Sequence, residues 1–238
     1  MLDERLLALA QRLASDEELV EGHAAAEITV EDAADIVDAL HAQLDDATAA
    51  RAEHAAQQGM PLACGPGCTG CCEELVLIFL PEAHAVARWL MRDENRAARE
   101  ACLEAYPSWK QRVGAAPAEL AATYAAGDAD EFLVRHVAQW RRRILCAFNR
   151  DGLCTIYPVR PLLCRNAHAV GTSAHCYGDD PSGEPVVHLG ARAVDAFVDN
   201  VRAFNRAAHH ALGGPRREPR ALCDEVHRLL IDWPRRER

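Results

Sequence analysis

Apolar positions recur every three or four residues through the first third of the chain, which is the spacing of amphipathic helices. This pattern predicts one helix over residues 2–20. A second helix is predicted to begin at Thr29, a favourable N-cap residue followed by an acidic first turn, and to continue to about Gln58. Gly59 and Pro61 then end it, because neither residue sustains a helix.

The rest of the chain shows helical periodicity on both sides of an irregular segment. The short apolar run at residues 75–80 fits either a strand or the start of a helix, and Asp151-Gly152 between short apolar pieces predicts a β-hairpin. Residues 154–188 are rich in proline, glycine and histidine, which predicts irregular structure. Further helices are predicted over residues 81–91, 96–113, 117–126, 130–145, 191–212 and 220–233.

These elements predict a mostly α fold, a helical domain with an irregular cysteine-rich metal-binding lobe that contains a short β-hairpin. We divide the chain into N-terminal helices (1–60), a cysteine-cluster region (61–180) with inserted helices (73–145), and C-terminal helices (181–238), all within one compact domain. Composition supports this fold class, since half of the residues are hydrophobic, only 5% are aromatic, and alanine, the best helix former, is abundant.

Charge and hydropathy narrow the class of protein. The formal net charge of −10 is opposite in sign to that of proteins that neutralise nucleic-acid phosphates, so no nucleic-acid partner is expected. The first residues lack the basic and apolar regions of a signal peptide, and the longest large-apolar run is too short to span a bilayer. We therefore expect a cytoplasmic protein with no membrane partner. Thiols stay reduced in that compartment, so the ten cysteines predict metal or redox chemistry rather than structural disulfides.

Eight of the ten cysteines fall into two groups in loop-rich sequence. Three glycines in the first group permit a tight turn that directs several sulfurs toward one point, where ionised cysteine binds a borderline or soft metal. Cys102 and Cys223 stand alone in helical patterns, and we interpret them as small buried apolar residues. The predicted metal ligands are Cys64, Cys68, Cys71, Cys72, Cys146, Cys154, Cys164 and Cys176.

Spacing alone does not choose the metal. All-thiolate sites suit both tetrahedral zinc and iron–sulfur clusters, and the adjacent Cys71 and Cys72 favour two ions or a multi-iron cluster. His168 and His175 flank the last two cysteines and could substitute as ligands, although we favour a supporting or surface position for each of them. The spacing of the first three cysteines is also that of radical-SAM enzymes. However, Gly70 stands where those enzymes place an aromatic residue, and the chain lacks the alternating strands and helices of their barrel.

The second group carries the more diagnostic sequence, CAFNRDGLCTIYPVRPLLCR over residues 146–165. Together with CGPGCTGCC over residues 64–72, it resembles the YkgJ-type cysteine-cluster family of zinc- or iron-chelating proteins. That family pairs a CxxCxxCC signature with a later Cys…Gly-x-Cys-x-Ile-Tyr-x-x-Arg-Pro-x-x-Cys-Arg segment. The match covers about residues 60–180. The chain departs from the family in one extra residue between its first two cysteines, in Cys-Ala-Phe-Asn for the usual Cys-Pro-Phe-Leu, and in a long spacer.

The resemblance implies that a zinc or iron centre, with a 4Fe-4S cluster as one iron form, is the expected cofactor and partner. A relative, the flagellin lysine methylase, is similar in its cysteine group and implies an iron–sulfur cluster with methyl transfer. Four thiolates around a divalent metal leave a formal charge of about −2. Arg160 and Arg165 beside Cys164 are therefore expected to offset this charge and to donate hydrogen bonds to sulfur.

Three functions follow from these observations. The first is a metal-binding cysteine-cluster protein of unassigned biochemical role, whose full set of cysteine ligands argues for a closed structural site. The second is an iron–sulfur-dependent redox or methyl-transfer enzyme. Glu73 and Glu74 beside the first cysteine group could be its acid–base residues, although we favour solvated surface acids for both. The third is a thiol-based redox sensor whose cysteines cycle to disulfides.

Overall fold

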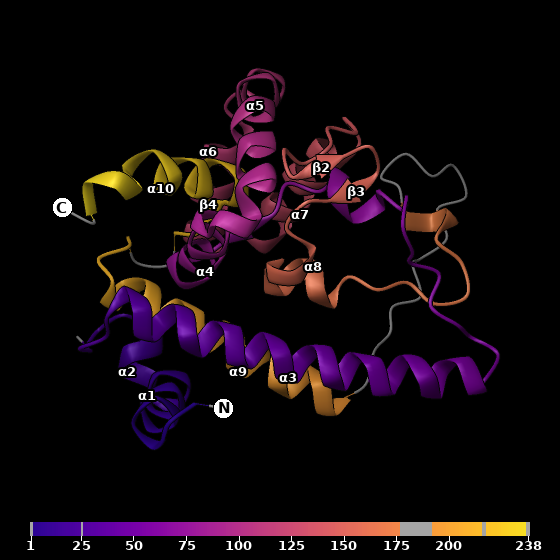
Figure 1. Ribbon diagram of the computed structural model, residues 1–238. Helices are drawn as coiled ribbons and strands as arrows, with labels where there is room; N and C mark the ends of the chain where they lie inside the picture. The colour runs from indigo at the N-terminus through magenta and orange to yellow at the C-terminus, as the bar shows by residue number, and fades with distance from the viewer. Residues whose placement is uncertain (1, 25, 177–191, 216–217, 237–238) are drawn as a thin grey trace.

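The computed structural model describes residues 2–24, 26–176, 192–215 and 218–236, and these residues are mostly helical, as predicted (Figure 1). The α-helices are α1 (Glu4–Ser15), α2 (Glu17–Val20), α3 (Val30–Gln57), α4 (Leu80–Met91), α5 (Arg96–Val113), α6 (Ala116–Ala126), α7 (Ala129–Trp140), α8 (Leu162–Asn166), α9 (Arg192–Ala211) and α10 (Leu222–Arg236). The shorter elements are the strands β1 (Leu77–Ile78), β2 (Asn149–Arg150), β3 (Leu153–Cys154) and β4 (Arg220–Ala221) and the 3-10 helices η1 (Gly70–Glu73), η2 (Asp93–Asn95), η3 (Tyr157–Val159) and η4 (Ala174–Cys176). None of the described helices has the length and apolar character that crossing a bilayer requires.

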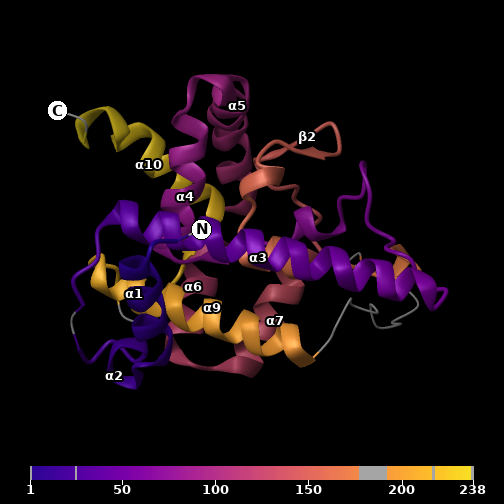
Figure 2. The ribbon, with the colours of Figure 1, turned by 60° about the horizontal axis from the view of Figure 1, so that its bottom comes forward.

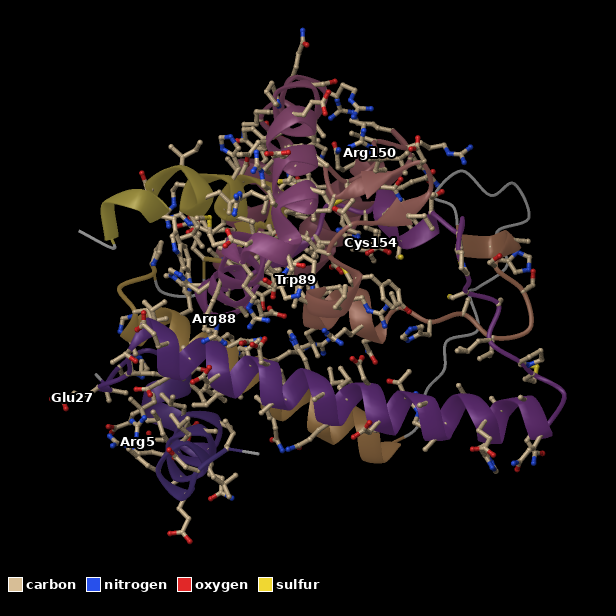
Figure 3. All side chains as sticks on the ribbon, in the orientation of Figure 1. Arg5, Glu27, Arg88, Trp89, Arg150 and Cys154 are labelled. Carbon is tan, nitrogen blue, oxygen red and sulfur yellow. The ribbon has the colours of Figure 1, made fainter. Side chains whose placement is uncertain are left out.

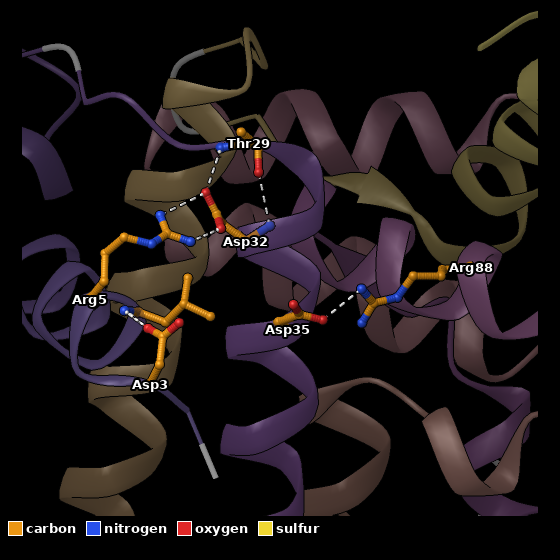
Figure 4. A network of polar contacts seen from close by, with 7 residues as sticks. Asp3, Arg5, Thr29, Asp32, Asp35 and Arg88 are labelled. Carbon is orange, nitrogen blue, oxygen red and sulfur yellow. Dashed lines mark hydrogen bonds and ion pairs between the residues drawn. The ribbon is translucent and has the colours of Figure 1, made fainter. Parts of the chain in front are cut away.

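Several helices begin where their local signals predicted. Thr29 is the N-cap of α3, since its hydroxyl accepts a hydrogen bond from the N–H of Asp32 at 3.0 Å and the Asp32 carboxylate accepts one from the N–H of Thr29 (Figure 4). This reciprocal capping satisfies two backbone donors that the start of a helix leaves unpaired. Pro81 lies in the first turn of α4, where a helix does not need its missing N–H.

Two predicted helices are shorter than expected. The helix predicted over residues 2–20 is two helices, because Asp16 ends α1 and its side chain caps α2. The helix predicted over residues 130–145 ends at Trp140, and Arg143 beyond it has a positive φ of 53° that no α-helix accommodates. Both breaks are local and lie within sequence that keeps its helical periodicity.

A pairing between distant strands was not predicted. The first two residues of the helix predicted over residues 220–233 form β4, which pairs antiparallel with β1 so that Leu77 lies opposite Ala221. The apolar run at residues 75–80 therefore supplies a strand and, from Leu80, the first turn of α4. Both alternatives left open for residues 75–80, a strand or the start of a helix, are therefore correct for part of the run.

The β-hairpin predicted at Asp151-Gly152 is confirmed, with β2 and β3 paired antiparallel on either side of the turn. The segment predicted to be irregular over residues 154–188 is wrong in part, since it contains η3, α8 and η4 before residue 177. The rest of that segment, residue 191 and the predicted boundary between residues 180 and 181 lie outside the described residues.

Helix α4 joins two hydrophobic clusters. Ala85 packs with Leu13, Ile36 and Phe204 in the cluster formed by α1, α3 and α9, while Leu90 belongs to the larger cluster that β1, α5, α6 and α10 enclose. Figures 1 and 2 show α3 and α9 side by side, with α4 lying over them in the view of Figure 1. A helix that is covered on opposite sides is apolar around most of its circumference, which explains the buried alanines of α4.

Ion pairs at the edge of this core connect the first helices to α4. Arg5 of α1 binds Asp32 of α3, with 2.5 Å between Nη2 and Oδ1. Arg88 of α4 binds Asp35 of α3 at 2.7 Å (Figure 4) and also binds Asp38 of α3 at 2.8 Å. Partly exposed pairs of this kind contribute about 0–1 kcal/mol each, so they align the helices more than they stabilise the fold.

Candidate metal centre

A cavity of about 600 Å³ lies between the first cysteine group, the hairpin and α8. Cys154, labelled in Figure 3, is the last residue of β3 and lies on the side of the hairpin that is nearer α8 in that view. None of the ten cysteines is in a disulfide. Seven of the eight cysteines predicted as ligands line the cavity, namely Cys64, Cys68, Cys71, Cys72, Cys146, Cys154 and Cys164.

The first cysteine group folds as a turn followed by η1. Cys68 N–H donates to the carbonyl of Gly65 at 3.0 Å, and Cys72 N–H donates to the carbonyl of Thr69 at 2.8 Å. Gly70 is required here by a close approach rather than by its φ, since a Cβ on it would lie 2.7 Å from the Cβ of Cys176. The absence of a side chain at this position therefore lets the eighth cysteine pack behind the turn.

Backbone hydrogen bonds connect this turn to two distant segments. Cys146 N–H donates to the carbonyl of Cys72 at 2.8 Å, which joins the start of the second cysteine group to the end of the first. On the other side, Ala63 N–H donates to the carbonyl of Ala169 at 2.9 Å, and Ala169 N–H donates to the sulfur of Cys64 at 3.2 Å. These contacts hold Cys64 against the segment that follows α8.

The hairpin holds Cys154 against the first group. Asp151 and Gly152 both have positive φ, 52° and 80°, as a tight type I′ turn requires. Asn149 caps the turn by accepting the N–H of Gly152 at 3.2 Å, and its side chain also contacts the sulfur of Cys72. Asn149 is a residue of the site that the sequence analysis missed, although an asparagine three positions before a glycine is a recognisable turn signal.

Helix α8 is fixed on α3 and α4 by buried polar side chains. Glu82 of α4 accepts the N–H of Leu162 at 2.6 Å and lies 3.5 Å from Nε2 of His41 on α3. Arg165 of α8 binds Asp45 of α3 and donates to two carbonyl oxygens of the preceding loop. Because both ends of this short helix are anchored, it presents Cys164 to the cavity in a defined position.

The two arginines predicted near the thiolates differ in position. Arg160 lines the cavity, is only 9% exposed, and stacks on Tyr157 with 3.8 Å between its Cζ and the ring centroid. Its positive charge lowers the pKa of Cys154 and so offsets part of the rise that burial causes. Arg165 is not among the lining residues and instead holds α8 in place. Arg160 is thus placed to act on the thiols, whereas Arg165 acts on the backbone around them.

Burial and mutual repulsion dominate the ionisation of the thiols. Burial, together with smaller contributions from the neighbouring Cys146 and Cys72, raises the pKa of Cys154 to about 11. Burial likewise raises the pKa of Cys164 well above its usual value. Cys72 is the exception, because a hydrogen bond from the Cys71 thiol lowers its pKa to about 6 and correspondingly raises that of Cys71. A cation in the cavity would oppose this repulsion.

The remaining candidates lie at the margin of the cavity. Cys176 does not line it, but burial and the nearby Cys64 and Cys68 raise its pKa to about 11, which places it just behind the turn. Among the alternative ligands, His168 lines the cavity, with Nε2 3.5 Å from Nη2 of Arg160, whereas His175 does not. Burial and the charge of Arg160 lower the pKa of His168, which favours the neutral imidazole that metals bind.

The two candidate acid–base residues are engaged elsewhere. Glu73 is buried and pairs with Arg143, with 3.3 Å between Oε1 and Nε. Glu74 pairs with His136 at 3.7 Å. Neither side chain is among those that line the cavity, so their contacts give no support to a role in proton transfer there.

The sequence analysis also missed a contact of Cys223. This residue is buried, as predicted, with 3% of its surface exposed, but its sulfur lies 3.5 Å from the sulfur of Cys146. No local pattern reveals this contact, because the two cysteines are 77 positions apart and meet only through tertiary packing.

The residues of the cavity fit a soft metal by chemistry but not a single ion by spacing. Thiols are the ligands that zinc and iron–sulfur clusters share. Within the described ranges, however, no three His, Cys, Asp or Glu side chains form a group able to hold a metal ion. Tetrahedral zinc–sulfur bonds of about 2.3 Å would bring the sulfurs to roughly 3.8 Å from one another. The sulfurs surround a cavity rather than a point.

Comparison with known proteins adds no relative, since no protein-family model, curated protein or solved structure matches this chain.

Proposed function

We propose that this chain binds a metal centre of zinc or iron through the thiols of the cavity. The observation that carries the proposal is that seven of the eight cysteines predicted as ligands line one cavity, although they come from segments far apart in the sequence. Unrelated thiols have no reason to converge in this way. Arg160 on the cavity wall supports the proposal further, because its charge opposes the negative charge of ionised thiols.

The cavity cysteines would hold the metal, with Cys176 and His168 beside them. Bound there, zinc would cross-link the three segments as a Lewis acid, and an iron–sulfur cluster would supply electron transfer. The chain's own thiols release protons when they bind a cation. Since burial raises the pKa of Cys154 to about 11 and raises that of Cys164 well above its usual value, metal affinity rises with pH through the neutral range.

The open arrangement of the sulfurs favours a centre with several metal atoms over one tetrahedral ion. Seven thiols exceed the four ligands of a mononuclear zinc site, and they enclose about 600 Å³. A polynuclear centre accepts more thiolates over a wider span. The arrangement of the thiols therefore favours an iron–sulfur cluster over a single structural zinc ion.

The experiment is metal analysis of protein purified without oxygen, combined with acid-labile sulfide measurement and a visible absorption spectrum. The variant Cys154→Ser removes a cavity thiol, and Cys102→Ala, which removes a fully buried thiol outside the cavity lining, is the control. We expect iron with sulfide, or zinc, in the wild type and in Cys102→Ala, and a reduced content in Cys154→Ser. Metal-free protein that cannot be reconstituted with either metal would contradict the proposal.

An iron–sulfur-dependent enzyme of redox or methyl-transfer type is the second candidate function. It is supported by the size of the cavity and by its apolar wall, which includes Val76, Phe148, Ile156 and Leu222. A purely structural centre needs no such wall. Electron paramagnetic resonance of the reduced centre, with and without a methyl donor such as S-adenosylmethionine, tests it. A changed signal supports an open metal position, and an unchanged signal supports the closed structural site.

A further inference from the structure

Cys146 and Cys223 form a sulfur–sulfur contact that lies between the cavity and the core. The distance between the two Sγ atoms is 3.5 Å. Cys146 is half-buried and lines the cavity, whereas Cys223, in the first turn of α10, is 3% exposed and lies outside the lining. Cys146 is therefore accessible to small molecules that enter the cavity, whereas Cys223 is shielded from solvent.

Both cysteines are held by backbone contacts on either side of the sulfurs. Cys146 N–H donates to Cys72, and Leu222 N–H donates to the carbonyl of Val76 at 2.9 Å, which fixes the start of α10. The N–H of Ala147 also donates to the sulfur of Cys223. The two thiols thus face each other across a rigid junction between the second cysteine group and the C-terminal helix.

We propose that Cys146 and Cys223 are a redox pair that forms a disulfide when a peroxide enters the cavity. The sulfur of Cys146 attacks hydrogen peroxide, which gives the sulfenic acid of Cys146 and one water. The sulfur of Cys223 then attacks the sulfenic sulfur, and a second water leaves as the disulfide forms. The two thiols lose two protons and two electrons in total, and the peroxide is reduced to two waters.

The pair links oxidation to the proposed metal centre, and only this consequence rests on the proposed function. Cys146 cannot bind a metal and a disulfide partner at once, because both use the same sulfur. Oxidation would therefore remove one ligand and tie α10 to the second cysteine group, and bound metal would protect Cys146 from peroxide. Cys223, which the sequence analysis assigned to the apolar core, would thus determine whether Cys146 binds metal or forms a disulfide.

Tryptic cleavage separates the relevant cysteines cleanly. Cys146 lies alone in the peptide of residues 144–150 and Cys223 alone in that of residues 221–228, while Cys102 lies in residues 100–110. Metal-free protein is treated with one equivalent of hydrogen peroxide, blocked with N-ethylmaleimide in denaturant and digested without reductant. We expect a cross-linked pair of peptides 144–150 and 221–228, with a loss of two free thiols per chain, and its disappearance on reduction.

The variants Cys223→Ala and Cys102→Ala remove buried thiols of the same core cluster, so they form a matched pair. Cross-linking should vanish in the first and persist in the second. An intact peptide 221–228 carrying only N-ethylmaleimide, or a cross-link of residues 144–150 to another cysteine peptide, would overturn the proposal even if a variant fails to fold. Metal-loaded protein that cross-links as fast as metal-free protein would instead exclude Cys146 as a ligand and leave the redox pair intact.

Discussion

Gly152 in the hairpin turn lies directly against the backbone of Gly67 in the first cysteine group. A Cβ on Gly152 would lie 3.3 Å from the Cα of Gly67 and 3.8 Å from its carbonyl oxygen. The two cysteine groups, far apart in the sequence, therefore touch through two glycines, and any side chain at this point pushes them apart. This contact sets how closely the hairpin approaches the first cysteine group.

We predict that Gly152→Ala lowers both stability and metal content. Its φ of +80° costs a residue with a Cβ about 1–2 kcal/mol, and the methyl group also displaces the first cysteine group. Gly127→Ala is the matched control, because Gly127 has a φ of +74° and open space around its Cβ position. Urea unfolding should show a similar loss for both variants, whereas metal analysis should show a loss only for Gly152→Ala. Equal metal contents would mean that the contact does not shape the site.

The position of Cys176 gives a second prediction. A Cβ on Gly70 would lie 2.7 Å from the Cβ of Cys176 and 2.9 Å from its carbonyl oxygen, so Gly70→Ala must displace η4 from the first cysteine group. Gly65→Ala, in the same turn but with nothing within 4 Å, is the control. If Cys176 is a ligand, Gly70→Ala and Cys176→Ser should reduce metal content to the same extent, and their combination should reduce it no further. A full metal content in both variants would remove Cys176 from the ligand set.

The different positions of Arg160 and Arg165 predict different effects of substitution. Arg160→Gln removes the buried charge at the cavity wall and should weaken metal binding about 10- to 100-fold, as is typical of groups that support metal ligands. Arg160→Lys keeps the charge and should retain most of the affinity. Arg150→Gln, at an exposed position of the hairpin, should have no effect. A competition titration with a chromophoric chelator measures all three variants.

For Arg165 the expected loss is in the free energy of unfolding rather than in metal affinity. Arg165→Lys cannot reproduce the hydrogen bonds that the guanidinium donates to Pro158 and Arg160 while it binds Asp45. Unfolding in urea should show this variant to be less stable than wild type. A metal affinity that falls as far as in Arg160→Gln, with stability unchanged, would reverse the two assignments.

Structural features that depend on residues close together in the sequence could be predicted from it, whereas contacts between distant segments could not. The Thr29 N-cap and the Asp151-Gly152 turn depend on residues that are close together in the sequence, so both predictions are confirmed. Asp16 shows the limit of periodicity, because a capping residue can divide a helix whose apolar spacing continues across it.

The candidate site was likewise predictable in its local features but not in its contacts between distant segments. The cysteines were recognisable by composition and spacing, and most of them line one cavity. The contact of Glu82 with Leu162 and that of Cys146 with Cys223 join residues about 80 positions apart, and no periodicity encodes such a meeting. The supporting residues of the site therefore became visible only with the fold.

The buried side chain of His209 connects α9 to α4 and to the segment that leads to β4. Its Nδ1 accepts the N–H of Leu80 at 3.1 Å, so the neutral ring carries its proton on Nε2 and donates it to the carbonyl of Pro215 at 3.1 Å. A Cβ on Gly214 would lie 2.3 Å from the ring, which explains the glycine there. Burial lowers the pKa of His209 from 6.5 to about 4, with the charge of Arg220 adding to this effect.

We therefore predict that protonation of His209 destabilises the fold in mild acid. The unfolded chain binds this proton near pH 6.5 and the folded chain only near pH 4, so the contribution of His209 is fully present above pH 6.5 and is lost as the pH falls toward 4. Urea unfolding should show a loss of about 2 kcal/mol between pH 7.5 and pH 5 from this residue. His209→Asn should be less stable at pH 7.5 but should lack this part of the pH dependence, while His54→Asn, at an exposed position on α3, should keep it. The same pH slope in all three proteins would show that another group is responsible.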